Sequence, residues 1–343
     1  MKAIIKEKEG KGFVLKNVDE PEIKQPDEIL IKVKAASICG TDVHIYDWTE
    51  WAKNRIKPPL IVGHEFSGKV VEVGSEVKRF KPGDFVSAET HIYCGHCRMC
   101  LNGNQELCEN LKVIGVDRDG IFAEYVVLPE RVVWKNPPNI SEEVASIQEP
   151  LGNAVDTVLA EDISGKSVAI VGVGPIGLMA VALSRVLGAT KIFVSDLSDY
   201  HLNLSRKLGA DVTVNVKKES FVERVMDETK GKGVDVGLEM SGNEAGLRDL
   251  LKVVSPIGRI SLLGIFDGDV KIDITNDVVL KKLRLYGIHG RKIFGTWFKV
   301  RELLSSGKLD IAPVITHKFK LEDFEKGFEV MKNKESGKVI LIP

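Results

Sequence analysis

Four cysteines that lie close together form the clearest chemical motif of this chain. Their arrangement is Cys-x2-Cys-x2-Cys-x7-Cys. Four thiolates can close a tetrahedral zinc site that has no open position and therefore no chemistry of its own. An iron–sulfur cluster is the alternative, but its motif usually has a proline after the last cysteine, where this chain has Glu109. We therefore expect a structural zinc lobe over about residues 91–113, held by Cys94, Cys97, Cys100 and Cys108.

A second set of residues of metal-binding types is scattered more widely. Catalytic zinc takes about three ligands from cysteine, histidine or carboxylate and keeps one position open. Cys39, His64 and Glu149 could supply these ligands, with Glu65 as an alternating or outer ligand. Taken singly, a lone cysteine is usually a small buried side chain, and a lone His–Glu pair usually lies on the surface. Spacing alone does not assemble these residues into one site.

A glycine-rich turn at residues 172–177 fits the pattern G-x-G-x-x-G through Gly172, Gly174 and Gly177. Small residues let the backbone approach a pyrophosphate, which then lies at a helix N-terminus. Asp196 ends a strand-like run roughly 20 residues further on, where a carboxylate accepts hydrogen bonds from ribose hydroxyls and repels a 2′-phosphate. The turn therefore predicts NAD binding rather than NADP binding. The alternative is a tight strand-to-helix turn with a surface aspartate.

The elements around this turn alternate between strand-like and helical patterns. An apolar strand at Ser167–Val171 precedes the turn, a helical segment runs to Leu187, and a strand follows at Lys191–Asp196. Such alternation predicts a parallel sheet covered by helices on both faces. The further elements expected are a helix at Tyr200–Leu208 and strands at Val234–Glu239, Gly258–Leu263 and Leu283–Gly287.

The first 90 residues are predicted to be rich in strands instead. Ile29–Val33 and Gly68–Val73 are alternating or apolar runs, and Pro82-Gly83-Asp84 has the chemistry of a tight turn. Another strand is expected at Phe122–Leu128. The tail is expected to hold helices at Trp297–Ser305 and Leu321–Lys332 and a strand at Lys338–Ile342.

The composition limits the possible partners and locations. At 343 residues, two domains are expected. The 48 Lys and Arg nearly cancel the 49 Asp and Glu, so no field favours nucleic acid or an anionic membrane surface. The longest apolar stretch, Val168–Leu183, is broken by glycines and a proline and does not fit a membrane span. The charged first residues do not fit a signal peptide, and five cysteines without a secretory signal make disulfides improbable, so we expect a cytoplasmic protein.

Together the motifs resemble the zinc-containing branch of the medium-chain dehydrogenase/reductase family. This resemblance implies an α/β fold in which a doubly wound, NAD-binding Rossmann domain (151–290) is inserted into a β-rich, GroES-like catalytic domain (1–150 and 291–343) that carries the four-cysteine zinc lobe. The matching residues are Cys39-Gly40-Thr41-Asp42, Gly63-His64-Glu65, Gly83-Asp84-Phe85-Val86, the four cysteines and the turn at 172–177.

The resemblance also implies roles for individual residues. Cys39, His64 and Glu149 or Glu65 would hold a catalytic zinc, so two zinc ions are expected per chain. Thr41 and His44 would relay a proton. One departure is His201, which occupies a position where the family usually has arginine near the adenosine. The implied NAD contacts are Ile176, Asp196, Leu263, Gly264, Ile265, Ile288 and His289, with an imidazole contact from His201 left open.

The reaction implied is the oxidation of a secondary alcohol with hydride transfer to NAD. The segment Trp48–Trp51, with Glu149–Ala154, Gly237–Gly242 and Gly287–Arg291, favours the amino alcohol L-threonine as the substrate, oxidised to 2-amino-3-oxobutanoate on the way to glycine. A polyol or another secondary alcohol, such as sorbitol or 2,3-butanediol, is the alternative. A non-catalytic NAD sensor would be expected to lack a catalytic zinc ligand. Arg291 is a candidate for the substrate carboxylate on charge alone, and the resemblance implies a homotetramer.

Overall fold

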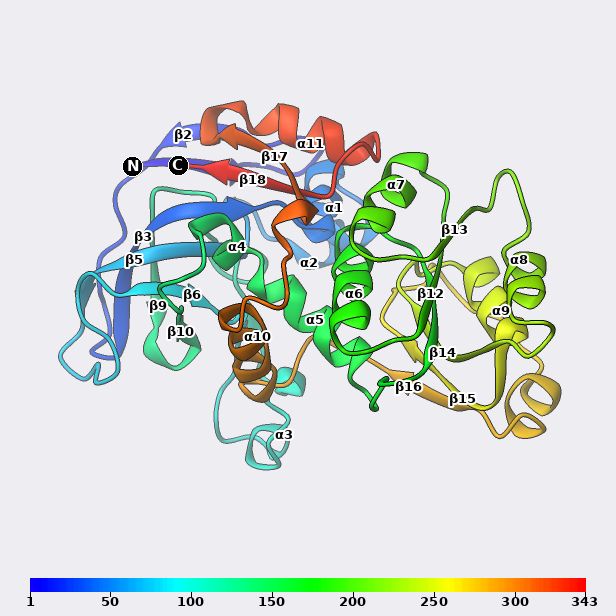
Figure 1. Ribbon diagram of the computed structural model, residues 1–343. Coiled ribbons are helices and arrows are strands. Elements are labelled where there is room, and N and C mark those ends of the chain that lie inside the picture. The colour runs from blue at the N-terminus through cyan, green and yellow to red at the C-terminus, as the bar shows by residue number, and fades with distance from the viewer.

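The computed structural model describes residues 1–343, and its two lobes lie side by side (Figure 1). Helix α5 (Gln148–Val158) lies between them and packs on α6 (Pro175–Val186) of one lobe and on α10 (Gly295–Ser305). The predicted boundary at residue 150 therefore falls inside a helix rather than in a linker. The domain limits stay a prediction.

The first lobe is built on a seven-stranded sheet. Its order is β10-β6-β5-β3-β18-β17, with β9 also paired to β3. A smaller sheet, in the order β2-β1-β4, packs beside it. The strands are β1 (Lys2–Lys6), β2 (Val14–Asn17), β3 (Glu28–Ser37), β4 (Leu60–Ile61), β5 (Glu65–Val73), β6 (Phe85–Ala88), β9 (Tyr125–Pro129), β10 (Val133–Lys135), β17 (Ile315–Lys320) and β18 (Lys338–Ile342).

The C-terminal strand returns to the N-terminal half of the chain. β18 pairs antiparallel with β3, so Ile340 lies opposite Ser37. β17 adds to the same edge in parallel, and α11 (Phe324–Lys332) packs on both strands. The sequence of β17 is mostly polar and does not alternate between apolar and polar residues, so this strand was not predicted. The predicted helix at Leu321–Lys332 begins at Phe324, because residues 321–323 form a 3-10 turn.

Two helices interrupt the region predicted to be rich in strands. They are α1 (Gly40–Asp47) and α2 (Glu50–Arg55). Cys39 begins α1, where its backbone N–H donates to the Asp42 carboxylate at 2.8 Å. This capping contact satisfies a backbone donor at the helix start, and it explains why a short polar segment is helical here.

The second lobe holds a six-stranded parallel sheet in the order β13-β12-β11-β14-β15-β16. The strands β11, β12 and β14 have the predicted bounds. Helices α5, α6 and α7 contribute to the apolar core on one face, and α8 and α9 to that on the other. The elements are β11 (Ser167–Val171), β12 (Lys191–Asp196), β13 (Val212–Asn215), β14 (Val234–Glu239), β15 (Val254–Leu262), β16 (Arg284–Gly287), α7 (Asp199–Lys207), α8 (Phe221–Glu228) and α9 (Glu244–Val253).

The order of the strands reverses between β11 and β14. The chain leaves β11 toward β12 and β13 on one side and returns to β14, β15 and β16 on the other. In open parallel sheets, ligands bind outside the carboxyl ends of the strands at such a reversal. The glycine-rich turn follows β11 at this point.

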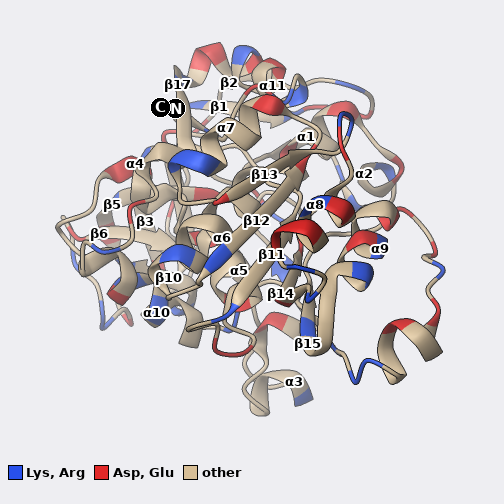
Figure 2. Cartoon of the chain, turned by 45° about the vertical axis from the view of Figure 1, so that its right-hand side comes forward, with Lys and Arg blue, Asp and Glu red and all other residues tan.

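The cysteine-rich segment projects from the first lobe as a small separate unit at the bottom of Figure 1. It contains β7 (His91–Ile92), α3 (Arg98–Leu101) and β8 (Lys112–Val113), while α4 (Glu142–Ser146) lies against the main sheet. Figure 2 shows basic and acidic residues interspersed over the side it draws, as the balanced composition predicts. None of the helices combines the length and the apolar character that crossing a membrane requires.

Candidate active site and metal centres

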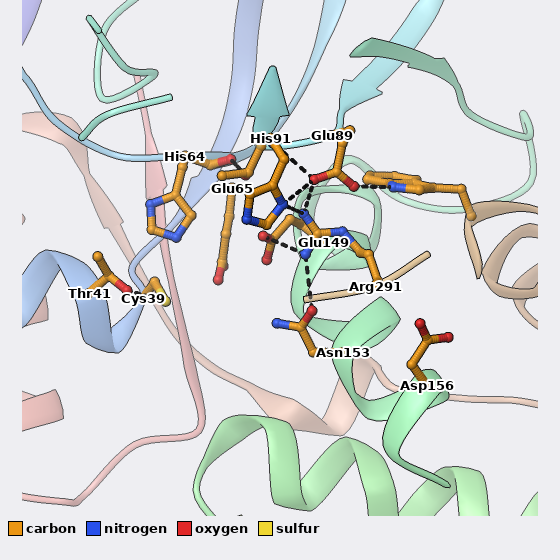
Figure 3. Close-up of polar contacts among 12 residues, drawn as sticks. Cys39, Thr41, His64, Glu65, Glu89, His91, Glu149, Asn153, Asp156 and Arg291 are labelled. Carbon is orange, nitrogen blue, oxygen red and sulfur yellow. Dashed lines mark hydrogen bonds and ion pairs between the residues drawn. The ribbon is translucent and has the colours of Figure 1, made fainter. Parts of the chain in front are cut away.

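Cys39, His64 and Glu65 meet in the first lobe although they are distant in the sequence. One ligand atom of each lies within 4.8 Å of those of the other two. Cys39 stands at the start of α1, Glu65 is the first residue of β5, and His64 directly precedes it. Figure 3 shows the three side chains near one another. His64 and Glu65 are buried, and Cys39 is partly exposed. The cluster is therefore open on the cysteine side.

Glu65 is held in place from behind. One of its carboxylate oxygens, Oε2, accepts hydrogen bonds from the Ser37 hydroxyl and from the Lys338 ammonium group. Ser37 is the last residue of β3, which pairs with β5. Lys338 is the first residue of β18, which pairs with β3. The pKa of Glu65 is nonetheless raised, first by burial, against the lowering effect of Lys338. The other oxygen, Oε1, has no partner.

Three buried polar atoms of this cluster and its neighbour Asp42 have no hydrogen-bond partner. They are His64 Nδ1, Glu65 Oε1 and Asp42 Oδ1, and the histidine and aspartate atoms lie 3.6 Å apart. A buried polar group without a partner is costly, so native structures normally satisfy it. Asp42 and Cys39 raise the pKa of His64 against the lowering effect of burial. The same negative field attracts a metal ion, and cysteine, histidine and glutamate are zinc ligands.

Glu149 lies next to this cluster but is paired with an arginine. Its Oε1 is 2.7 Å from Arg291 Nη1, and its charge contributes to raising the pKa of Glu65. Arg291 also contacts the Glu89 carboxylate and donates to Asn153 Oδ1 at 3.0 Å (Figure 3). Its side chain is only 1% exposed. The suggestion that Arg291 binds the substrate carboxylate is therefore wrong, because buried carboxylates already occupy the guanidinium group.

Thr41 and His44 lie on α1 beside the cluster. The Cys39 thiol lies 3.8 Å from the Thr41 hydroxyl oxygen. His44 is three residues further along the helix, and residues at this spacing share a face. His44 is exposed, whereas Thr41 is half-buried. The helix thus places a hydroxyl near the metal-binding residues and an imidazole at the solvent side.

The four cysteines of the projecting segment form a second cluster. Their sulfur atoms all lie within 4.8 Å of one another. Cys97 Sγ is 3.8 Å from Cys108 Sγ, and Cys94 Sγ is 4.0 Å from Cys100 Sγ. A tetrahedron with bonds of about 2.3 Å has edges of about 3.8 Å, so these positions fit a single zinc ion. They leave no room for the several iron atoms of an iron–sulfur cluster.

Backbone amides help to lower the pKa of Cys94 and Cys97, whereas burial raises the pKa of Cys100 to about 12. The Cys97 amide donates to Cys94 Sγ at 3.4 Å, and the amides of Cys94 and Asn110 both donate to Cys108 Sγ at 3.3 Å. Such contacts help to lower the pKa of Cys94 to about 6, with the amide of His96 as the largest cause. Zinc binds the thiolate, so this loop is prepared for the metal.

Each glycine of the turn at residues 172–177 is needed for a different structural reason. Gly172 has a φ of +83°, which only glycine adopts readily. A Cβ atom at Gly177 would lie 2.2 Å from the Gly172 carbonyl oxygen, so this glycine permits close packing of α6 on β11. A Cβ atom at Gly174 would meet nothing within 4 Å. That open side, at the start of α6, is where a pyrophosphate would approach the backbone.

Asp196 ends β12 beside the same turn. Its carboxylate accepts hydrogen bonds from the amides of Val173 and Ser198, both at 2.8 Å. Burial opposes ionisation, but contacts with His201 and these amides outweigh it and lower the pKa of Asp196. A cavity of about 620 Å³ lies over the ends of β11, β12 and β14, and both Asp196 and His201 line it.

The remaining predicted cofactor contacts lie further along the same edge of the sheet. Ile176 is half-buried in the first turn of α6. Leu263, Gly264 and Ile265 follow β15, and Ile288 and His289 follow β16. Ile288 and His289 line a second cavity of about 420 Å³ together with Glu106 of the cysteine-rich segment. None of these five strand-end residues lines the cavity at Asp196.

Several supporting residues were not predicted from the sequence. Lys338, Glu89 and Asp42 are all buried, and each contacts or faces a predicted site residue. A lysine at the start of the apolar strand 338–342 was a usable signal, because a buried lysine requires a partner. Glu89 had no comparable signal.

Comparison with known proteins agrees with this geometry. Residues 25–138 match the alcohol dehydrogenase GroES-like domain, and residues 175–306 match the zinc-binding dehydrogenase family. An L-threonine 3-dehydrogenase from Pyrococcus horikoshii is 52% identical over 343 residues, which cover 100% of this chain and 98% of that protein.

Solved structures share the whole fold. A protein from Sinorhizobium meliloti 1021 bound to NADP has a TM-score of 0.91 and 32% identity, covering 100% of this chain and 99% of that one. An alcohol dehydrogenase from Escherichia coli CFT073 complexed with NADH has a TM-score of 0.89 and 28% identity, with the same coverage. The fold of both lobes is thus shared with solved dehydrogenases that bind nicotinamide cofactors. The chain belongs to the zinc-containing branch of the medium-chain dehydrogenase/reductase family.

Proposed function

We propose that this protein oxidises the 3-hydroxyl group of L-threonine to 2-amino-3-oxobutanoate and transfers the hydride to NAD. The observation that carries the reaction type is the cluster of Cys39, His64 and Glu65, whose ligand atoms lie within 4.8 Å of one another. The relative from Pyrococcus horikoshii, which is similar over the whole chain, supports threonine as the substrate. A non-catalytic sensor is disfavoured because every predicted zinc ligand is present.

Two zinc ions per chain belong to this proposal. The four cysteines of the projecting segment would hold one for stability alone, since four thiolates leave no open position. Cys39, His64 and Glu65 would hold the other, and Glu149 is the alternative carboxylate ligand because it lies close to Glu65. When bound, this zinc supplies Lewis acidity that favours ionisation of an alcohol, and the nicotinamide ring supplies the hydride acceptor.

The chain's own residues move the proton. Thr41, next to Cys39, would accept the hydrogen bond of the substrate hydroxyl, and His44 on the exposed side of α1 would pass the proton to solvent. An imidazole suits this task because its ordinary pKa lies near neutral pH. Lys338 and Ser37 would keep Glu65 fixed while charge changes beside it.

The cofactor would lie along the carboxyl ends of the parallel strands. Gly174 would let the pyrophosphate approach the start of α6, and Asp196 would accept hydrogen bonds from the adenosine ribose. The ionised carboxylate of Asp196 favours NAD, because it repels the 2′-phosphate of NADP. The strand ends at 263–265 and 288–289 would lie toward the nicotinamide.

A substrate panel tests the proposal. Formation of reduced cofactor is measured with threonine, sorbitol and 2,3-butanediol, each with NAD and with NADP, before and after treatment with a chelator. We expect kcat/KM to be highest with threonine and NAD and to fall on removal of the metal. A higher kcat/KM with sorbitol or 2,3-butanediol would show that threonine is not the preferred substrate. Full activity in metal-free protein would overturn the zinc-dependent mechanism.

The assembly and location form part of the same proposal. Strand β16 is paired on one side only, and exposed apolar side chains lie on β15 and in the segment that precedes β16, namely Ile257, Ile274, Val279 and Leu280. An unpaired strand edge beside apolar surface favours association with another copy of the chain, which supports a homotetramer. Free thiols in the metal clusters suit the reducing cytoplasm.

A further inference from the structure

The segment between α11 and β18 crosses from the first lobe to the cofactor cavity of the second. The Ser198 hydroxyl donates to the Lys334 carbonyl oxygen at 3.2 Å, and His201 Nε2 donates to the Ser336 carbonyl oxygen at 2.9 Å. Figure 1 shows this loop reaching the start of α7. His201 and Ser336 are both buried, at 6% and 4% exposure, so the contact is part of the packed structure.

This crossing segment, Lys334–Gly337, brings a positive charge to the cavity. Lys334 is the only lysine or arginine that lines it, whereas Asp196 and Asp249 supply negative charge. His201 of α7 also lines the cavity, but its Nε2 is occupied by the Ser336 carbonyl oxygen. A cation for the adenosine half of the cofactor is therefore available from the crossing segment, because neither Arg206 nor Lys207 of α7 lines the cavity.

The backbone at Lys334 adopts a conformation that disfavours side chains. Its φ is +58°, in the left-handed region, directly after Asn333, which caps the C-terminal end of α11. Glycine is the usual residue at this position of a helix end, because it has no Cβ to strain. Lys230 has the same geometry after α8, with a φ of +53°, but does not line the cavity. Lys230 therefore serves as a matched control.

We propose that the crossing segment closes the adenosine end of the cofactor cavity, with Lys334 as the cation that attracts the adenosine diphosphate half of NAD and His201 as the residue that positions the segment. The proposal rests on the proposed function, since it assumes that NAD occupies this cavity. It makes the first lobe a contributor to adenosine binding. Lys334 is then a binding residue, and His201 acts through the segment that it holds.

Binding of ADP-ribose to the full-length, zinc-loaded protein tests Lys334 apart from catalysis. Isothermal titration calorimetry should show a Kd about two- to fivefold higher for Lys334→Gln, the effect of one exposed charge. The difference should shrink as salt rises, because salt screens such a charge. With threonine, KM for NAD should rise while kcat stays the same. An unchanged Kd for ADP-ribose at low salt would overturn the proposal.

Lys334→Gly separates binding from stability. Relief of the left-handed strain should raise the midpoint of thermal unfolding, while loss of the cation weakens ADP-ribose binding. The control Lys230→Gly should raise the midpoint as well and leave binding unchanged. If Lys334→Gly changed stability alone, as the control does, Lys334 would be a structural residue only.

A double-mutant cycle tests the positioning role of His201. His201→Leu removes the donor to the Ser336 carbonyl oxygen, so Lys334→Gln should then have little further effect on ADP-ribose binding. His201→Gln keeps a donor and should retain part of the wild-type affinity. Additive effects of the two changes would overturn the positioning role. Absence of ADP-ribose and NAD binding in the wild-type protein would instead refute the proposed function itself.

Discussion

Cys39 contributes to the candidate active site in two ways at once. Its thiol belongs to the buried cluster with His64 and Glu65, and its backbone starts the helix that carries Thr41. A change at the sulfur can therefore be made without disturbing the helix, because the capping contact uses the backbone N–H of Cys39 and the Asp42 carboxylate.

Cys39→Ser should lower kcat for threonine by more than about 100-fold, because even the outer partners of zinc ligands contribute 10- to 100-fold. The Kd for NAD should change little, since the cofactor cavity lies in the other lobe. Steady-state kinetics and calorimetry measure the two effects. Retention of full kcat would show that Cys39 does not hold a catalytic metal.

At the scale of elements, the turn between β11 and α6 distinguishes two kinds of glycine. Gly177 lies against the carbonyl oxygen of Gly172, and Gly174 faces open space. The first is needed for packing inside the protein and the second for the approach of a ligand.

Gly177→Ala should lower the free energy of unfolding by about 1–3 kcal/mol, because its Cβ would force α6 away from β11. Gly174→Ala should leave stability nearly unchanged and raise the Kd for NAD by about tenfold or more, which corresponds to at least about 1.4 kcal/mol. Urea unfolding and calorimetry compare the two variants. Equal losses of stability would contradict the separate roles of the glycines.

A buried carboxylate joins three elements around α5. Glu89 follows β6, and its carboxylate accepts a hydrogen bond from Arg291. Trp297 Nε1, in α10, donates to Glu89 Oε2 at 2.7 Å. Burial alone would raise the pKa of Glu89, but Arg291, His91 and Trp297 outweigh it and lower the pKa to about 2. The folded state thus binds the Glu89 proton more weakly than the unfolded state.

Because the folded pKa is depressed, this stabilisation is complete above the unfolded pKa of about 4.5 and is lost as the pH falls toward about 2. The loss should amount to about 3 kcal/mol. Glu89→Gln should remove that part of the pH dependence in urea unfolding, measured with and without a chelator. The control Glu7→Gln, at an exposed pair with Lys16, should keep it. The same slope in both variants would show that Glu89 is not the titrating group.

At the scale of the whole molecule, the unpaired edge of β16 and the apolar residues near it form the surface through which we expect copies to associate. Leu280 is 71% exposed and Val279 is 63% exposed beside this edge. Burial of such side chains against a second copy would contribute about 1.5–3 kcal/mol for each one fully covered.

Leu280→Asp should therefore shift the proposed tetramer toward smaller species in light scattering after size-exclusion chromatography. Val71→Asp, at a 43% exposed valine on β5 of the other lobe, is the control and should leave the assembly unchanged. Identical tetramers in both variants would exclude this edge as the contact surface.

The sequence by itself determined the local features of this protein. The strands β11, β12, β14 and β18 have the predicted bounds, because mostly apolar residues fill their buried positions. The cysteine-rich segment predicted its own metal centre, since the four ligands lie within a short loop. The turn at 172–177 was equally local, and its glycines have the geometry that their spacing indicates.

Only the tertiary structure brought Cys39, His64 and Glu65 together, because strands β3, β5 and β18 pair across long stretches of chain. It also decided that Arg291 holds Glu149 instead of a substrate, and that Lys334 reaches the cofactor cavity. Such contacts depend on strand register and on the packing of two lobes. Residue types and spacing within the sequence do not specify these long-range distances, although they do specify local turns and apolar strands.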